Sequence, residues 1–111
     1  MSEAPSLDKR RAERVKVQLE LSFADGRRFC TGELRDISST GAGVEALEGC
    51  PRGTRLTLVL PLRPPVKLQG EIQWVVQDGL HYRMGIRFLG IGPAEEREIK
   101  RLVEDLKWSR R

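Results

Sequence analysis

Two short strings in the N-terminal third of the chain carry side chains suited to binding a charged ligand. The first contains Arg10 and Arg14, whose spacing lets a loop or a single turn bring both to one ligand. A guanidinium group keeps its charge and binds phosphate oxygens with a planar fork of donors. The second contains Asp36, which only accepts hydrogen bonds when ionised, and Ser38, whose hydroxyl both donates and accepts. Together these types predict a site that combines cations for phosphate with an acceptor for N–H groups.

Each string also has a purely structural explanation. Arg10 and Arg14 are equally typical of a solvated basic tail. Residues 36–41 read as a turn, in which Asp36 and Ser38 satisfy their own backbone. Gly41 lacks a Cβ, so the chain can turn sharply there or approach another group closely. The residues alone leave both interpretations open.

The charge of the chain is concentrated near its N-terminus. The 111 residues contain 20 Lys and Arg against 16 Asp and Glu, a net charge of +4. The stretch from Lys9 to Lys16 holds five cations and one anion, so it alone carries as much net charge as the entire chain. A near-neutral body with one basic cluster indicates an anionic partner at that end.

Most of the chain after this cluster alternates apolar and polar residues, which is the pattern of half-buried strands. Asp25-Gly26 and Asp78-Gly79 each match the signal for a two-residue hairpin turn. The alternation predicts six strands, over about residues 15–23, 27–34, 42–46, 56–62, 66–76 and 82–88. Six antiparallel strands in so short a chain avoid unpaired edges by closing on themselves.

The last segment changes period, because Ile99, Leu102, Val103 and Leu106 share one face of a helix. Pro93 suits the first turn of that helix. The fold class predicted is therefore mainly β: a six-stranded antiparallel β-barrel with a C-terminal α-helix packed on it. The predicted organisation is a disordered lead, a ligand-binding loop, the barrel, the helix and a basic tail, over residues 1–8, 9–14, 15–89, 93–107 and 108–111.

Several classes of protein are disfavoured. No stretch approaches the ~20 apolar residues of a membrane-spanning helix, and no secretory signal is visible, so we expect a cytoplasmic protein. Cys30 and Cys50 are then small, reduced hydrophobic residues, and with His81 they lack the close ligand pairs of a zinc site. Ser38, His81 and Asp36 come with no nucleophile turn or oxyanion site. We therefore expect no metal, no cofactor and no enzymatic activity.

At its two polar strings the chain resembles the PilZ family, which are receptors for the bacterial second messenger cyclic di-GMP. Arg10 and Arg14 match the RxxxR string of that family, whereas Asp36, Ser38 and Gly41 match its [D/N]xSxxG string. The order of the strings and the barrel-then-helix pattern also agree. The segment Tyr82-Arg83-Met84-Gly85-Ile86-Arg87-Phe88 looks like the last barrel strand of the family.

This resemblance implies that cyclic di-GMP is the ligand. Arg10 and Arg14 would bind its phosphates, or the edge or face of a guanine. Asp36 would accept from the N1–H and N2–H₂ donors of guanine, with Ser38 beside it. Gly41 would allow the backbone to approach the base closely.

Three further residues are candidates for the same site. Lys9 and Arg11 border the first string and would add phosphate contacts, and in the family the position of Lys9 influences whether one ligand or a stacked pair binds. Trp74 lies in a strand where related receptors carry an aromatic residue beside the ligand. However, its phase with Ile72 and Val76 favours packing in the core.

The resemblance also suggests a mechanism. Repulsion between like charges keeps residues 1–14 mobile until ligand phosphates neutralise Arg10 and Arg14, and the segment then folds over the barrel. The altered surface would signal to a downstream protein in motility or biofilm regulation. Two alternatives stay open. One is a PilZ-like adaptor of pilus or motility machinery that does not use nucleotide. The other is a small basic barrel for single-stranded nucleic acid, which the chain's six aromatic residues disfavour.

Overall fold

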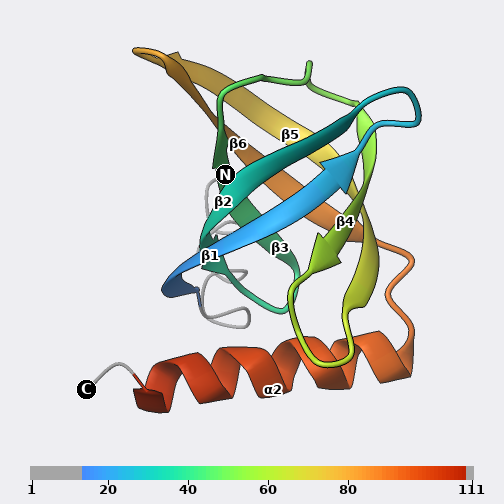
Figure 1. Ribbon diagram of the computed structural model, residues 1–111. Helices are drawn as coiled ribbons and strands as arrows, with labels where there is room; N and C mark the ends of the chain where they lie inside the picture. Colours follow the sequence, from blue (N-terminus) through green and yellow to red (C-terminus); the bar gives the residue numbers. More distant parts are fainter. Residues whose placement is uncertain (1–13, 110–111) are drawn as a thin grey trace, which may run out of the picture.

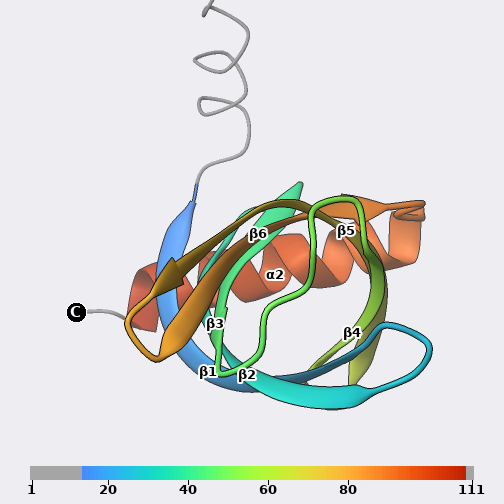
Figure 2. The same cartoon turned by 90° about the horizontal axis from the view of Figure 1, so that it is seen from above.

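The computed structural model describes residues 14–109, with side chains as far as Leu106. Its elements are β1 (Val15–Ala24), β2 (Phe29–Ile37), β3 (Gly41–Ala46), β4 (Arg55–Leu60), β5 (Val66–Asp78), β6 (His81–Leu89) and α2 (Pro93–Ser109). The strands are antiparallel and close into a barrel in the order β1-β2-β3-β6-β5-β4. Figure 1 shows α2 across the lower end of this barrel, and Figure 2 looks down on the ring of strands with α2 beneath it. The predicted barrel with a C-terminal helix is confirmed.

The alternating pattern of the sequence fills the barrel with apolar side chains. Phe23, Leu34, Leu58 and Met84 come from four different strands and are each at most 1% exposed. Ile99 of α2 is also fully buried, so the helix closes one end of the same core. Burial of this apolar surface is the main force that holds the closed sheet and the helix together.

The start of α2 follows from its first residues. Pro93 occupies the first helical position, where its missing N–H costs no intrahelical hydrogen bond. The Glu95 carboxylate accepts from the backbone N–H of Gly92 at 3.1 Å and so caps the first turn. The helix ends at Ser109, two residues beyond the predicted end at residue 107. The expected disordered lead, residues 1–8, lies outside the described residues.

Of the two predicted hairpin turns, one has the expected length. Asp78 pairs with His81, which leaves Gly79 and Leu80 as a two-residue turn with Gly79 at a φ of +67°. The β1–β2 connection instead spans four residues, 25–28, because Asp25 Oδ1 accepts from the backbone N–H groups of residues 27 and 28 at 3.0 and 2.9 Å. These two donors hold the pKa of Asp25 below its ordinary value.

Irregular pairing in β2 and β5 breaks the alternation that the sequence suggests. In β2 the register with β3 shifts between Leu34 and Asp36, so Leu34 and Ile37 are both buried although they are three residues apart. The strand also continues to Ile37, so Asp36 lies within β2 rather than in a turn. Each shift is a β-bulge, in which one extra residue reverses the faces of all residues beyond it.

The predicted core position of Trp74 is wrong, because β5 contains a bulge. The register with β6 shifts between Ile72 and Trp74, so Ile72 is buried and Val75 packs against the core. Trp74 and Val76, which were expected to share the core face with Ile72, are instead 47% and 54% exposed. The bulge therefore turns the indole to the outer surface of the barrel.

The two cysteines are free thiols that serve as small apolar residues. Cys50 is buried, and its backbone N–H lies 3.4 Å from the sulfur of Met84. Burial raises the pKa of both the Cys30 and the Cys50 thiols, which keeps them protonated. Across residues 14–109, no helix has the length and apolar character needed to cross a lipid bilayer.

Replacing Leu58 by alanine removes a fully buried side chain from the middle of the barrel. We expect Leu58→Ala to lower the free energy of unfolding by about 2–5 kcal/mol, because it leaves a cavity in a close-packed core. Urea denaturation followed by circular dichroism measures the change. Leu80→Ala is the matched control, since Leu80 is 84% exposed. Equal losses in the two variants would contradict this description of the core.

Candidate ligand-binding site

Four residues on adjacent strands form a row across the outer face of the barrel. Asp36 of β2 pairs with Gly43 of β3, Gly43 pairs with Gly85 of β6, and Gly85 pairs with Trp74 of β5. An acid and an indole thus stand at the two ends of a strip whose middle positions have no side chain.

The two glycines are required by the side chains that lie over them. A Cβ on Gly43 would come within 2.9 and 3.0 Å of the two carboxylate oxygens of Asp36. A Cβ on Gly85 would overlap the indole of Trp74 at Nε1 and its neighbouring carbons. The side chains of Asp36 and Trp74 therefore both extend over the glycines of the strip. Because these glycines have no Cβ, the two side chains can lie close to the backbone.

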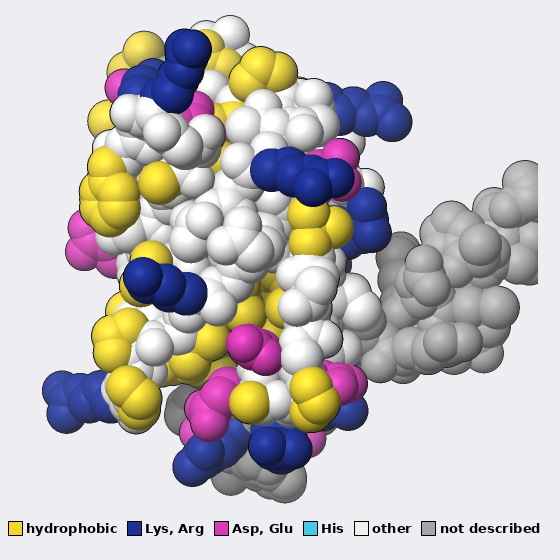
Figure 3. Space-filling view, turned by 90° about the vertical axis from the view of Figure 1, so that its right-hand side faces the viewer, with side chains coloured by type: hydrophobic (Ala, Val, Ile, Leu, Met, Phe, Trp, Pro, Cys, Tyr) yellow, Lys and Arg dark blue, Asp and Glu magenta, His cyan; other side chains and the backbone are white. Residues whose placement is uncertain are grey.

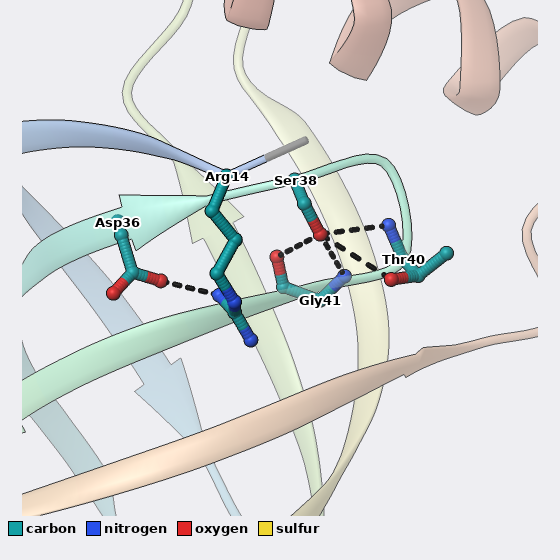
Figure 4. A network of polar contacts seen from close by, with 5 residues as sticks. All are labelled: Arg14, Asp36, Ser38, Thr40 and Gly41. Atoms are coloured by element: carbon teal, nitrogen blue, oxygen red, sulfur yellow. Dashed lines mark hydrogen bonds and ion pairs between the residues drawn. The ribbon is translucent and has the colours of Figure 1, made fainter. Parts of the chain in front are cut away.

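The side chain of Arg14, the residue just before β1, reaches this strip. Its Nη1 donates to Asp36 Oδ1 at 2.5 Å (Figure 4), and the two side chains are 51% and 34% exposed. The pairing of Lys16 with Asp36 across β1 and β2 brings the start of β1 beside the carboxylate. An ion pair with this much solvent exposure contributes only about 0–1 kcal/mol to stability. The structure thus brings together one residue from each of the two sequence strings.

These residues surround a pocket of about 260 Å³. Its lining residues are Arg14, Arg35, Asp36, Gly43, Val44, Trp74, Arg83 and Met84. Three guanidinium groups against one carboxylate make the pocket electropositive, and the indole adds an aromatic face. This combination can hold an anionic group beside a planar aromatic ring.

Sequence reasoning missed Arg35 and Arg83, which belong to neither string of the motif. Arg35 is the extra residue at the β2 bulge, and its Nη1 lies 3.1 Å from Glu33 Oε1 and 3.5 Å from Glu45 Oε1. Arg83 is exposed on β6, where it pairs in register with Val76. The alternation of β6 predicts that the side chain of Arg83 points outward. Nothing in the sequence indicates which of the outward-pointing residues lies at the pocket.

Ser38 lies in the turn between β2 and β3, and Gly41 is the first residue of β3. Ser38 is 1% exposed, and its Oγ accepts from the backbone N–H groups of Thr40 and Gly41, each at 3.2 Å (Figure 4). A Cβ on Gly41 would collide with the carbonyl oxygen of Ile86 on β6. Because β2 ends at Ile37, Ser38 does not continue the strand that carries Asp36. Both residues shape the turn, and their contact with a ligand stays a prediction.

Arg10, Lys9 and Arg11 lie outside the described residues. A larger and more open hollow of about 640 Å³ is lined by Glu20, Glu33 and Glu45 among others, and this acidic lining does not suit a phosphate ligand. No three acidic, histidine or cysteine side chains within residues 14–109 are grouped so that they could hold a metal ion.

Comparison with known proteins identifies a family with this fold. The model of the PilZ domain matches residues 8–105. No curated protein matches the sequence of the chain. Among solved structures, the PilZ domain of YcgR from Escherichia coli, with c-di-GMP, has a TM-score of 0.73 and 19% identity. That match covers 91% of this chain and 93% of the YcgR chain.

Two longer proteins contain the same fold. The Bacillus subtilis inhibitor of motility, MotI/DgrA, has a TM-score of 0.76 and 15% identity, over 93% of this chain and 53% of its own. The c-di-GMP complex of K. pneumonia MrkH has a TM-score of 0.76 and 14% identity, over 89% of this chain and 52% of its own. This chain thus spans about half the length of both proteins, and these likenesses show the fold alone.

Replacing Gly85 by alanine tests whether the Trp74 indole packs over Gly85. We expect Gly85→Ala to push the indole off the strip, because the added Cβ would occupy the place of its ring atoms. In a Trp108→Phe background, which leaves Trp74 as the only tryptophan in the sequence, its emission should shift to longer wavelength and acrylamide quenching should increase. Gln77→Ala on the same hairpin is the control. Unchanged emission in Gly85→Ala would contradict the packing of the indole over Gly85.

Proposed function

Because this chain belongs to the PilZ family, we propose that it is a receptor that binds cyclic di-GMP at the pocket between Arg14 and Trp74. The observation that carries the proposal is the gathering of three arginines, one aspartate and one indole around a single electropositive hollow. The structures of YcgR and MrkH described above hold c-di-GMP in the same fold, which supports this choice of ligand. The proposed activity is binding, without a chemical step.

Each part of the ligand has a complementary group in the pocket. Arg14 and Arg83 would donate to phosphate oxygens, for which the guanidinium fork is well shaped. The Asp36 carboxylate would accept from the N1–H and N2–H₂ groups of a guanine. Trp74, with its indole along the strip, would offer a face on which a base stacks.

Binding would exchange the Arg14–Asp36 ion pair for contacts with the ligand. In the structure each partner neutralises the other across 2.5 Å. Cyclic di-GMP offers the arginine a phosphate and the aspartate a set of N–H donors, so both charges keep a partner after the exchange. Because the ion pair is half exposed, separating it costs little.

The size of the pocket supports a role for the residues ahead of β1. Pockets that enclose drug-sized ligands measure roughly 300–1,000 Å³, whereas this one measures about 260 Å³. A cyclic dinucleotide would therefore extend beyond it. We propose that the segment containing Arg10 folds over the exposed part of the ligand, which would change the surface offered to a downstream protein.

The nucleic-acid alternative finds less support. Binding of single strands requires a continuous basic groove with aromatic residues spaced along it. On the face shown in Figure 3, the basic side chains stand apart and are mixed with acidic ones. The other alternative is an adaptor that does not use nucleotide, and titration with cyclic di-GMP distinguishes it from the receptor.

Removing either member of the ion pair should weaken ligand binding. We expect Arg14→Ala and Asp36→Ala to bind cyclic di-GMP at least about tenfold more weakly, because each loses hydrogen bonds to a charged group. Isothermal titration calorimetry measures the affinity, with GTP and cyclic di-AMP as control ligands. Arg27→Ala and Asp78→Ala are matched exposed controls. Affinity equal to wild type in either site variant would refute the role assigned to that residue.

Folding of the N-terminal segment over the ligand should protect it from protease. Trypsin cleaves after arginine, and Arg10, Arg11 and Arg14 lie in this segment. We expect saturating cyclic di-GMP to slow cleavage at these three positions, as followed by mass spectrometry, while cleavage after Arg27 in the β1–β2 loop continues at its original rate. Slower cleavage everywhere would indicate general stabilisation. Unchanged cleavage at all sites, with binding intact by calorimetry, would rule out the folding of the segment.

A further inference from the structure

The hairpin formed by β5 and β6 extends beyond the neighbouring strands, at the upper left of Figure 1. β5 pairs with β4 only over Val66–Glu71, and Ile72 then exchanges two hydrogen bonds with the backbone of Gly53 and Thr54. From Trp74 to Asp78, β5 is paired with β6 along one side, and Gln73 is the extra residue of the bulge. Along its other side, no strand of residues 14–109 pairs with this segment, so its edge is open.

Apart from the bulge at Gln73, this edge lacks the features that usually prevent strand pairing between molecules. Natural edge strands are protected by charged residues, by proline or by bulges along the edge. Residues 73–77 read Gln-Trp-Val-Val-Gln, with no charge and no proline, and with types that favour β-structure. The bulge lies at the beginning of the segment, and pairing with β6 is regular from Trp74 to Asp78.

Exposed apolar side chains gather on the same hairpin. Trp74, Val76 and Leu80 are three of the five large hydrophobic residues that the described chain exposes. Such a concentration on one projecting element is typical of an interaction surface. The indole of Trp74 lies over Gly85 of β6, away from the open edge, so it leaves the edge backbone accessible.

The sequence of the edge is complementary to itself in the antiparallel sense. Pairing about a two-fold axis at Val75 sets this residue opposite its own copy. The same axis sets Trp74 opposite Val76 of the partner subunit and Gln73 opposite Gln77 of the partner subunit. The amides of the opposed glutamines can hydrogen-bond to each other, and the indole, which lies over Gly85, stays clear of the partner strand. A shift by one residue would break both glutamine pairs, setting Gln77 opposite Trp74 in one direction and Gln73 opposite Val76 in the other.

We propose that two copies of this chain associate through β5, in antiparallel register centred on Val75. The two hairpins then form one four-stranded sheet, and the interface is the same patch on both subunits, as two-fold symmetry requires. The pairing covers residues 73–77 and stops at Ile72, whose backbone is already bonded to Gly53 and Thr54. This association is independent of ligand binding, so either proposal stands if the other fails.

Charges introduced at Gln73 and Gln77 test the register as well as the association. Both side chains are exposed, so the barrel should tolerate the changes. In Gln73→Lys/Gln77→Lys, lysines face lysines twice, and we expect the dissociation constant of the dimer to rise about tenfold or more. Gln73→Glu/Gln77→Glu should weaken the dimer in the same way. An equimolar mixture of the two variants should dimerise again, because each lysine then faces a glutamate.

Sedimentation velocity over a series of protein concentrations measures the association. Gln18→Lys/Gln69→Lys adds the same charge at exposed positions elsewhere and should dimerise as the wild type does. A wild-type chain that stays monomeric at every concentration overturns the proposal. So does a wild-type dimer that the lysine variant leaves intact, since that dimer uses another surface. A mixture that fails to restore the dimer overturns the register.

Discussion

The site depends on one extra residue in each of two strands. Side chains on a strand alternate strictly between two faces, so a single insertion transfers every later residue to the opposite face. In β2 the shift lies between Leu34 and Asp36, and in β5 it lies between Ile72 and Trp74. Without these shifts, Asp36 would share the core face of Leu34, and Trp74 would share that of Ile72. The bulges allow one barrel to keep a continuous apolar core and to present an acid and an indole outside.

The Arg14–Asp36 ion pair suits the exchange of partners that we propose for ligand binding. A fully buried ion pair would be costly to separate, because each charge would lose both its partner and its solvent. This pair is 51% and 34% exposed, so water can solvate both groups while the ligand enters. Gly43 lies directly beneath the Asp36 carboxylate, so the ion pair rests close to the backbone of the strands. An exposed ion pair on this surface favours binding by replacement of contacts.

Alternation in the sequence predicted the six strands, the closed barrel and most of the core, because burial imposes a period of two on a strand. It failed at Trp74, since a bulge arises from pairing between strands and leaves no mark in the local pattern. The same limit hid Arg35 and Arg83, whose approach to the pocket depends on register across several strands. The β2–β3 turn was visible from residue types, but only coordinates show that the hydroxyl of Ser38 is already bonded to the backbone of that turn.

The unpaired edge of β5 and the outward-facing Trp74 both begin at the β5 bulge. At this point the strand stops pairing with β4, and Trp74 turns outward toward the pocket. The free edge of β5 and the aromatic wall of the site are therefore properties of the same few residues. Because the indole lies across β6 while the open edge faces the other way, the segment can present its backbone to a second chain and its aromatic face to a ligand. A change that straightened this bulge would remove both surfaces together, by returning Trp74 to the core face and Val75 to the outside.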